Sequence, residues 1–240
     1  PRDSLKREDK VPEELNIETA GVHKSYGSVQ ALAGLDLRVP RGAVCGLLGR
    51  NGAGKTTTIK VLLGMVRPTS GTARVFGLSA GDERASVEIR ERTAFVSEDK
   101  DVYAGMTVDE LIRFTAPFYP KWRADLASGY LAQLDLRADA RINDLSRGMR
   151  TKLALLIALP RGAELLILDE PTSGLDPAAT EQVLKILVEQ AGRDGTTVLF
   201  SSHQRGDVEQ IADRIAMVDR GRVVVDGALD DLRDAYRRVQ

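Results

Sequence analysis

A glycine-rich stretch, GRNGAGKTT, runs from Gly49 to Thr57 and has the residue types that bind phosphate. It matches the pattern G-x-x-x-x-G-K-[ST], whose last three positions here are Gly54, Lys55 and Thr56. The glycines let the backbone curve so that successive N–H groups point at phosphate oxygens, and the helix expected next adds its positive dipole. Lys55 is expected to reach the β- and γ-phosphates, and the Thr56 hydroxyl to bind Mg²⁺. The candidate nucleotide-binding residues are Gly49, Arg50, Asn51, Gly52, Ala53, Gly54, Lys55, Thr56 and Thr57.

Two acidic residues, Asp169 and Glu170, end the apolar run LLIL. The run predicts a buried strand, and in open α/β sheets the carboxyl ends of strands face the ligand crevice. Asp169 is then placed to hold Mg²⁺ through a water molecule, and Glu170 to take a proton from an attacking water. Alone, the pair is equally compatible with an ordinary acidic turn. The phosphate loop in the same chain favours the catalytic interpretation.

A second element with anion-binding chemistry is LSRGM, residues 145–149, which precedes the apolar run TKLALLIAL. Ser146 opens a predicted helix and Gly148 follows two places later, so this helix start offers bare N–H groups to an anion. The phosphate loop lies far upstream of it. The sequence therefore raises the question of why one domain carries two such elements.

Three apolar runs with little alternation predict the strands that position these residues. Such runs are typical of a parallel sheet that is covered on both faces. They are AVCGLLG (43–49), LLILDE (165–170) and TTVLFSSH (196–203). A helix is predicted from Lys55 through TTTIKVLLGMV, because apolar residues recur there at helical spacing. Shorter, partly exposed strands are predicted at 17–26, 31–39 and 71–77.

The middle of the chain, from about 107 to 160, predicts helices and no strand. Thr107 followed by Glu110 has the pattern of a capping box at a helix start. The result is a helical insertion in an α/β core. Residues 214–227 predict a hairpin that turns at Gly221, and the amphipathic segment LDDLRDAYRRV predicts a last helix.

The composition is typical of a globular protein. Hydrophobic residues make up 42% and charged residues 29% of the 240 residues, which allows a well-buried core. The net charge is −1 and no long basic stripe is present, so nucleic acid is not an expected partner. No apolar run approaches the roughly 18 residues that span a bilayer. We therefore expect a soluble, cytoplasmic chain, for which any membrane role would have to come through another polypeptide.

Two further features bear on location and order. Cys45 is the single cysteine, which rules out an internal disulfide and suits a reducing compartment. It lies in an apolar run and is expected to be a core residue rather than a nucleophile. Residues 1–15 mix both charges and lack the apolar core of a signal peptide, so we expect a flexible extension there.

The order of these motifs resembles the nucleotide-binding subunit of an ATP-binding cassette (ABC) transporter, over residues 16–230. Tyr26, in KSYGSVQAL, matches the aromatic residue that stacks on adenine in this family, and LSRGM matches the family's signature. SGLD, ending at Asp176, matches the loop after the acidic pair, and His203 matches the switch histidine that contacts the γ-phosphate. Singly, these residues suit a surface tyrosine, a helix N-cap before Pro177 and a turn histidine. Their order favours function.

The resemblance implies a P-loop NTPase (RecA-like) core with an N-terminal antiparallel β subdomain and an inserted α-helical subdomain. It places an ABC ATPase domain at 16–230, with the helical subdomain at about 100–160, and a C-terminal helix at 231–240. ATP and Mg²⁺ are the implied cofactors, and a separate transmembrane permease subunit is the implied partner. The location implied is cytoplasmic, peripheral on the inner face of the cell membrane.

The resemblance also answers the question of the second phosphate-binding element. In ABC subunits two chains pack head to tail, and the signature of one closes over the γ-phosphate held by the other. Ser146 would donate its hydroxyl and Gly148 its N–H. Whether the pair is a homodimer or a heterodimer is left open by the sequence.

Three residues depart from the family pattern. Glu98 stands where most members have glutamine, as a metal ligand and water positioner; a carboxylate could still bind Mg²⁺ but adds negative charge near the γ-phosphate. Arg147 and Met149 replace the usual glycine and glutamine of the signature, and Arg147 either adds positive charge near the phosphate or faces solvent. These departures resemble export-type bacterial subunits. A groove for the membrane partner is expected around Tyr103 and Met106.

Two other classes of protein were compared with this interpretation. A soluble ABC ATPase that acts on nucleic acid or ribosomes usually carries long coiled-coil insertions or two cassettes, and this chain has one compact cassette with almost no net charge. A GTPase or small-molecule kinase shares the phosphate loop, but the chain has no N-K-x-D motif for guanine. The signature and the switch histidine also favour the ABC class.

Overall fold

The computed structural model describes residues 14–99 and 105–237, which form two β-sheets and two groups of helices. The smaller sheet is antiparallel, with the strand order β2-β1-β4-β5. Its strands are β1 (Leu15–Tyr26), β2 (Val29–Pro40), β4 (Ser70–Val75) and β5 (Leu78–Ser79). This sheet confirms the three partly exposed strands predicted near the start of the chain.

The larger sheet has the order β10-β9-β3-β8-β7-β6, and all its neighbouring strands are parallel except the β9–β10 hairpin. Its strands are β3 (Val44–Leu48), β6 (Thr93–Val96), β7 (Leu165–Leu168), β8 (Thr197–Ser202), β9 (Arg214–Asp219) and β10 (Arg222–Ala228). Every residue of β3, β7 and β8 is buried, as their apolar runs with little alternation predict, and in β8 the buried residues include the polar Thr197, Ser201 and Ser202. The hairpin turns at Gly221, which has a φ of 75°.

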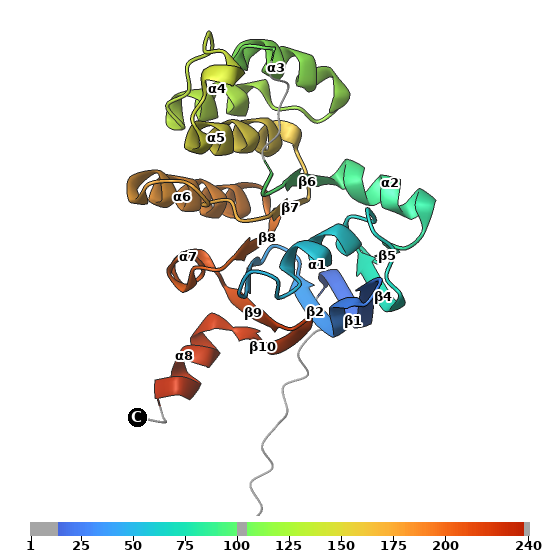
Figure 1. Cartoon of the computed structure of the whole chain (residues 1–240). Helices are drawn as coiled ribbons and strands as arrows, with labels where there is room; N and C mark the ends of the chain where they lie inside the picture. Colours follow the sequence, from blue (N-terminus) through green and yellow to red (C-terminus); the bar gives the residue numbers. More distant parts are fainter. Residues whose placement is uncertain (1–13, 100–104, 238–240) are drawn as a thin grey trace, which may run out of the picture.

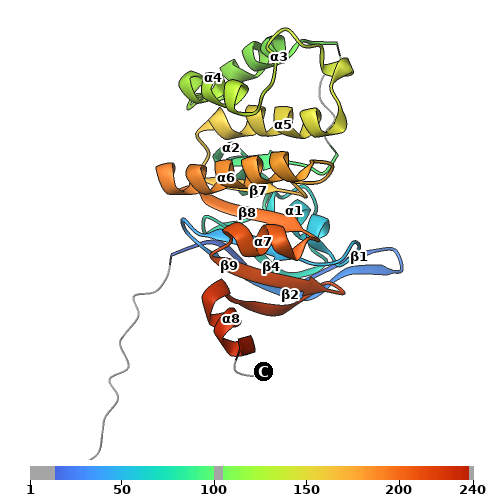
Figure 2. The ribbon, with the colours of Figure 1, turned by 90° about the vertical axis from the view of Figure 1, so that its left-hand side faces the viewer.

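Helices cover both faces of the larger sheet, and the molecule is built in layers (Figure 1; Figure 2). The helices close to the sheets are α1 (Lys55–Leu62), α2 (Glu83–Arg92), α6 (Pro177–Asp194), α7 (Arg205–Ile211) and α8 (Leu229–Arg237). A further helical layer lies beyond α6. It consists of α3 (Val108–Thr115), η1 (Ala116–Phe118), α4 (Ala124–Gln133), η2 (Ile142–Asp144), α5 (Arg147–Ala158) and η3 (Leu159–Arg161).

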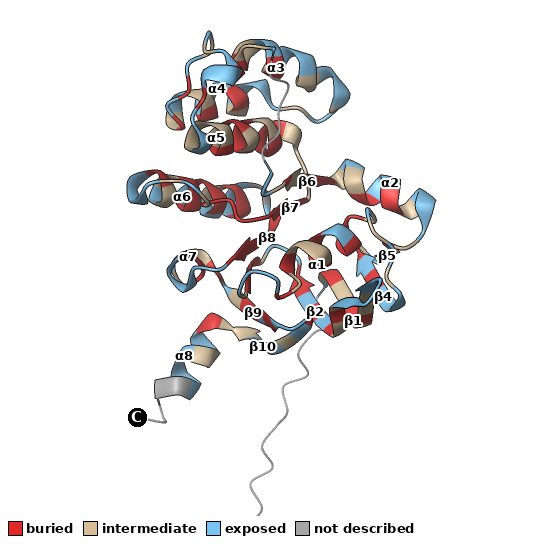
Figure 3. Ribbon diagram, viewed as in Figure 1, coloured by how far each residue is buried: buried red, intermediate tan, exposed pale blue. Residues whose placement is uncertain are grey.

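The side chains of the central strands alternate between two apolar cores. In β7, Leu166 and Leu168 face the helices α3–α6, whereas Leu165 and Ile167 face α1 and the antiparallel sheet. Because successive residues of a strand point to opposite faces, an apolar residue at every position supplies both cores at once. Figure 3 shows buried residues concentrated where these layers meet. The central strands are thereby held rigidly, and the loops at their ends are positioned by them.

Helix boundaries follow local sequence signals, with one correction. The capping box at α3 is present, since Thr107 accepts from the Glu110 N–H and the Glu110 side chain accepts from Thr107. The helix predicted to run from Lys55 through the segment GMV ends at Leu62 instead, because Gly64 follows in a left-handed conformation. The last helix begins at Leu229.

Three further expectations concern the N-terminal extension, the groove for a membrane partner and membrane-spanning helices. The extension proposed for residues 1–15 lies largely outside the described residues, and β1 begins at Leu15. Tyr103 also lies outside them, so the groove expected around it is not described. Among residues 14–99 and 105–237, no helix is both long and apolar enough to cross a membrane.

Candidate nucleotide-binding site

The glycine-rich loop joins the carboxyl end of β3 to the start of α1, which is the position predicted for it. Gly49 packs so closely that a Cβ there would lie 2.6 Å from the Val218 carbonyl oxygen. Gly54 has a φ of 113°, which side chains disfavour, and it forms the N-cap of α1. Within the described part of the chain no side chain caps this helix, so its first N–H groups are left for a ligand.

Lys55 is buried at the base of the loop, with 6% of its side chain exposed. Its Nζ donates to the Gly49 carbonyl oxygen at 2.7 Å. The same Nζ lies 3.1 Å from Oε1 of Glu170, which makes an ion pair that is not aligned as a hydrogen bond. Each charge compensates the other in a site with little water, and each would be costly to bury alone.

Asp169 and Glu170 follow directly after β7 and are both buried. Glu170 has a φ of 50°, a left-handed conformation that non-glycine residues rarely adopt and that is often found at functional sites. This backbone turn directs the two neighbouring carboxylates to different partners. Asp169 accepts from the Ser201 hydroxyl, whereas Glu170 extends to Lys55.

His203 lies just beyond β8 and contacts the other oxygen of Glu170. Its Nδ1 is 2.8 Å from Oε2, and 45% of its side chain is exposed. Glu170 therefore sits between a buried lysine and a histidine that opens to solvent. A carboxylate held from both sides in this way is oriented, and both of its partners are residues that the sequence analysis expects to contact phosphate.

A cavity of about 470 Å³ brings most of the predicted site residues together. Tyr26 lies at its edge with 47% of its surface exposed, so one ring face is accessible for stacking. The Lys24 Nζ lies 5.0 Å from the centre of that ring. Glu98 lines the same cavity and is exposed. The lining consists of Tyr26, Val29, Gln30, Ala31, Arg50, Asn51, Gly52, Gly54, Lys55, Thr56, Thr57, Glu98 and Glu170.

Four other predicted residues border this cavity without lining it. Gly49 and Ala53 belong to the loop itself, and the Ala53 carbonyl accepts from the Gly221 N–H at 2.8 Å, which ties the loop to the β9–β10 turn. Asp169 lies behind Glu170, and His203 contacts Glu170 from the far side. The hydroxyl of Thr56 and the carboxylates of Asp169 and Glu98 are hard oxygen donors, which is the donor set that Mg²⁺ prefers.

The signature segment does not line this cavity. Ser146 is the N-cap of α5 and its hydroxyl accepts from the Met149 N–H at 3.2 Å. Gly148 packs near the Gly174 carbonyl, and Asp176 caps α6 by accepting from the Ala179 N–H at 2.9 Å. Figure 1 shows the start of α5 in the helical layer, across the sheet from α1. The two elements that the sequence predicts to bind phosphate are thus separate in the chain.

Arg147 is held against the loop that follows the acidic pair. Its guanidinium donates to the Ser173 hydroxyl at 3.2 Å, and its stem packs on Gly174. The side chain is exposed. Arg147 therefore lies at the surface and does not line the cavity of Lys55, and both alternatives from the sequence, added positive charge near a phosphate or a side chain that faces solvent, stay predictions.

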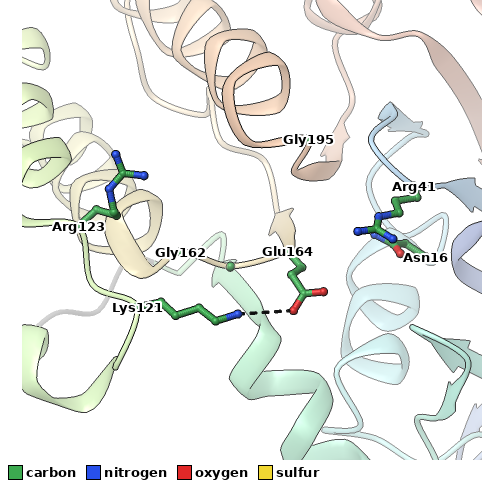
Figure 4. A pocket seen from close by; sticks show the side chains of 8 residues that line it. Asn16, Arg41, Lys121, Arg123, Gly162, Glu164 and Gly195 are labelled. Atoms are coloured by element: carbon green, nitrogen blue, oxygen red, sulfur yellow. Dashed lines mark ion pairs between the residues drawn. The ribbon is translucent and has the colours of Figure 1, made fainter.

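A different cavity, of about 310 Å³, lies at the amino ends of β3, β7 and β8 (Figure 4). Its charges are neutralised locally: Lys121 lies 3.8 Å from Glu164, and Arg41 lies 3.1 Å from Glu14. Ligands of open α/β sheets bind at the carboxyl ends of the strands, so the cavity at Lys55 is the functional candidate.

Two buried contacts at the site were not predicted. Ser201 contacts both Asp169 and the backbone of Glu170, and Thr172 donates to the buried carboxylate of Asp207 at 2.6 Å. The sequence feature that could have indicated Ser201 is the pair of hydroxyl residues, SS, at the end of a predicted strand whose central residues are apolar.

Comparisons with known proteins agree with this geometry. A family model described as ABC transporter matches residues 32–173. The daunorubicin/doxorubicin resistance ATP-binding protein DrrA of Streptomyces peucetius is 39% identical over 226 residues, covering 91% of this chain and 67% of that protein. The bacitracin transport ATP-binding protein BcrA of Bacillus licheniformis is 33% identical over 224 residues, covering 92% and 72%.

Solved structures share the fold. The structure of an ATP-binding subunit of an ABC transporter matches with a TM-score of 0.81 and 29% identity, over 92% of this chain and 93% of that one. The chain therefore belongs to the ABC transporter family. Within that family it is an ATP-binding, ATP-hydrolysing subunit, and the predicted P-loop NTPase fold is confirmed.

Proposed function

We propose that ATP binds in the cavity beside Lys55 and that the described residues act on it in defined roles. Tyr26 stacks on the adenine, and the backbone of residues 49–57 surrounds the phosphates. Lys55 neutralises the β- and γ-phosphates. The observation that best supports this proposal is that a single cavity is lined by the exposed ring of Tyr26, by the glycine-rich loop and by Glu170.

Mg²⁺ supplies positive charge that offsets the developing charge on the phosphates when it is bound. Thr56 and Asp169 are the residues proposed to hold it, and Glu98 takes the place of the usual neutral ligand. The support for this assignment is chemical, since all three contribute oxygen atoms near the loop.

Glu170 is the proposed general base for the attacking water, and His203 is proposed to contact the γ-phosphate. The ion pair between Lys55 and Glu170 bears on this step because the triphosphate competes for the same ammonium group. When the phosphate takes Lys55, Glu170 keeps its contact with His203 and has one oxygen available for water.

We further propose that the site is completed by a second ATPase subunit, either another copy of this chain or a related one. Ser146 and Gly148 lie away from the cavity of their own chain, and their helix start offers N–H groups to an anion. Head-to-tail packing would bring them to the γ-phosphate held by the partner. Hydrolysis then removes the contact that joins the two subunits.

The motion of this pair is proposed to drive a separate transmembrane permease, with the ATPase peripheral on the cytoplasmic face of the cell membrane. The relatives named above concern drug resistance and bacitracin transport. Nod factor export ATP-binding protein I of Cupriavidus metallidurans is also similar, at 35% identity. We infer an export-type system that moves a peptide, lipid or drug outward, and co-purification from membranes would identify its partner.

The decisive experiment is the Glu170→Gln variant, which keeps the side-chain shape but removes the base. We expect ATP binding to be retained in isothermal titration, turnover to fall about 10²- to 10⁴-fold, and an ATP-bound dimer to appear in size-exclusion chromatography. Glu91→Gln, an exposed carboxylate on α2, is the matched control and should retain activity. A Glu170→Gln protein that stays monomeric and fully active would contradict the proposal. Parallel assays with GTP, without an added acceptor, test nucleotide choice.

A further inference from the structure

One buried hydroxyl connects the two acidic residues of the site. Ser201, in β8, is fully buried. Its Oγ donates to Oδ1 of Asp169 at 2.5 Å and accepts from the backbone N–H of Glu170 at 2.9 Å. A serine hydroxyl has one proton and two lone pairs, so it can make both hydrogen bonds at once.

The backbone around the acidic pair explains why such a connection matters. The Asp169 N–H donates to the Val96 carbonyl in β6 at 2.8 Å, so β6 fixes the first residue of the pair. Glu170 lies beyond the end of β7 and has the left-handed φ of 50°. Its N–H is held by Ser201, from the opposite neighbouring strand.

Ser201 contacts both acidic residues, but their two carboxylates point to different partners. Asp169 is held beneath the cavity by Ser201, while Glu170 reaches Lys55 at 3.1 Å and His203 at 2.8 Å. Rotation of the Glu170 backbone out of its left-handed conformation would move its carboxylate away from both partners. A single side chain on β8 therefore controls the geometry of both acidic groups.

We infer that Ser201 is a positioning residue that orients Asp169 and the backbone of Glu170 for ATP hydrolysis. The inference rests on the roles proposed above for these two residues. Ser201 is fully buried and does not line the cavity, so it acts through the carboxylates. Its loss should therefore slow the chemical step while ATP binding at the glycine-rich loop persists.

A second buried hydroxyl of β8 provides a matched control. Thr197, at the other end of the strand, is also fully buried. Its Oγ1 accepts from the Gly42 N–H at 2.8 Å and from the Asn16 side chain at 2.6 Å. It thus makes the same number of hydrogen bonds as Ser201, but at the amino end of the sheet, far from the acidic pair along β8.

The test compares Ser201→Ala, Ser201→Thr and Thr197→Val in the full chain, with ATP and Mg²⁺ as the probe. Ser201→Ala should lower kcat by roughly 10- to 100-fold, as small misplacements of catalytic groups do, and leave KM within about threefold. Ser201→Thr, which keeps the hydroxyl, should recover most of kcat. Thr197→Val should lower the Tm but keep kcat. Thermal unfolding of each variant shows that it is folded.

An additional readout separates a positioning role from simple damage to the fold. Ser201→Ala should accumulate the ATP-bound dimer in size-exclusion chromatography, as is expected for Glu170→Gln. The reason is that the variant still binds ATP but hydrolyses it slowly. A loss of kcat no greater than that of Thr197→Val, or no recovery in a folded Ser201→Thr, would overturn the inference. If instead Glu170→Gln remains active, the proposed function fails, whatever the behaviour of Ser201.

Discussion

At the scale of single residues, the main feature of the site is that two side chains contact the same carboxylate, that of Glu170. Glu170 contacts Lys55 through one oxygen and His203 through the other. The lysine proposed to bind phosphate and the proposed base are therefore paired with each other. In the proposed function, triphosphate binding would exchange one partner of the lysine for another, which would limit the energetic cost of burying either charge.

Glu98 brings a negative charge to the cavity where the phosphates would lie. Glu98→Gln removes this charge, so we expect ATP affinity to rise about 2- to 10-fold. The Mg²⁺ concentration for half-maximal activity should increase, because a neutral amide is the weaker ligand for a hard cation. Titrations of ATP binding and of Mg²⁺-dependent turnover measure the two effects. Identical Mg²⁺ dependence in both proteins would make the carboxylate incidental.

Cys45 is buried in β3, and burial, with a further contribution from the charge of Asp226, raises the pKa of its thiol to about 12. In the unfolded chain the pKa of a cysteine is about 8.5. The neutral thiol therefore favours the folded state, and this stabilisation decreases as the pH rises above the unfolded value. At pH 8 we expect N-ethylmaleimide to label Cys45 only after unfolding in urea, as measured by mass spectrometry. Rapid labelling of the native chain would contradict this burial.

At the scale of elements, β3 packs closely against α7, and this packing affects the position of the segment that contains His203. Gly46 lies in β3, and a Cβ there would lie 2.4 Å from a methyl carbon of Val208 in α7. Since α7 begins two residues after His203, the position of this helix affects the segment that contacts Glu170. The absence of a side chain at Gly46 lets the helix approach.

Gly46→Ala should therefore overpack this contact and lower the free energy of unfolding by about 1–3 kcal/mol. Gly192→Ala is the matched control, because an added Cβ on the exposed side of α6 meets no described atom within 4 Å. In that helix the change should stabilise the chain by up to about 1 kcal/mol. Urea unfolding measures both values. Equal effects of the two substitutions would show that the contact with Val208 relaxes freely.

The elements that were predictable are those with a strong local pattern. β3 and β7 are apolar at nearly every position, β8 is apolar at its centre, and α3 carries its capping box. The helix α2 was missed because it buries only Ser86 and Ile89, which leaves little apolar periodicity. The four residues of β6 are too few to give a pattern.

The site divides in the same way. The glycine-rich loop and the acidic pair have local spacings that the sequence displays. The contacts of Ser201 depend on β8 lying between β3 and β7, an order that comes from long-range pairing and not from any segment alone. For the same reason, the ion pair of Lys55 with Glu170 required the folded chain.

At the scale of the whole molecule, the chain holds its two proposed phosphate-binding elements apart. Helix α1, which begins at Lys55, and helix α5, whose N-cap is Ser146, lie on different sides of the larger sheet (Figure 1). Under the proposed head-to-tail packing, one chain would offer half of each of two sites, and a closed pair would offer two complete ones. The rate of ATP hydrolysis should therefore depend on the association of two ATPase subunits.

Ser146 tests this arrangement through the difference between binding and turnover. Ser146→Asn keeps an N-cap residue for α5 but removes the hydroxyl donor. We expect hydrolysis to fall about 10²-fold, as for loss of one stabilising donor, with ATP affinity of the dilute chain unchanged. In the wild-type protein, activity per chain should rise with protein concentration. Equal losses of binding and turnover would indicate that the signature acts within its own chain.

The enclosed position of Cys45 has a practical consequence for following this encounter. The sequence contains no other cysteine, so a thiol placed on the surface, for example by Val224→Cys at a position 54% exposed, would be the sole reactive group in the native protein. A fluorophore or spin label could be attached there without first deleting the natural residue. The opening and closing of the subunits could then be timed in an otherwise unaltered chain.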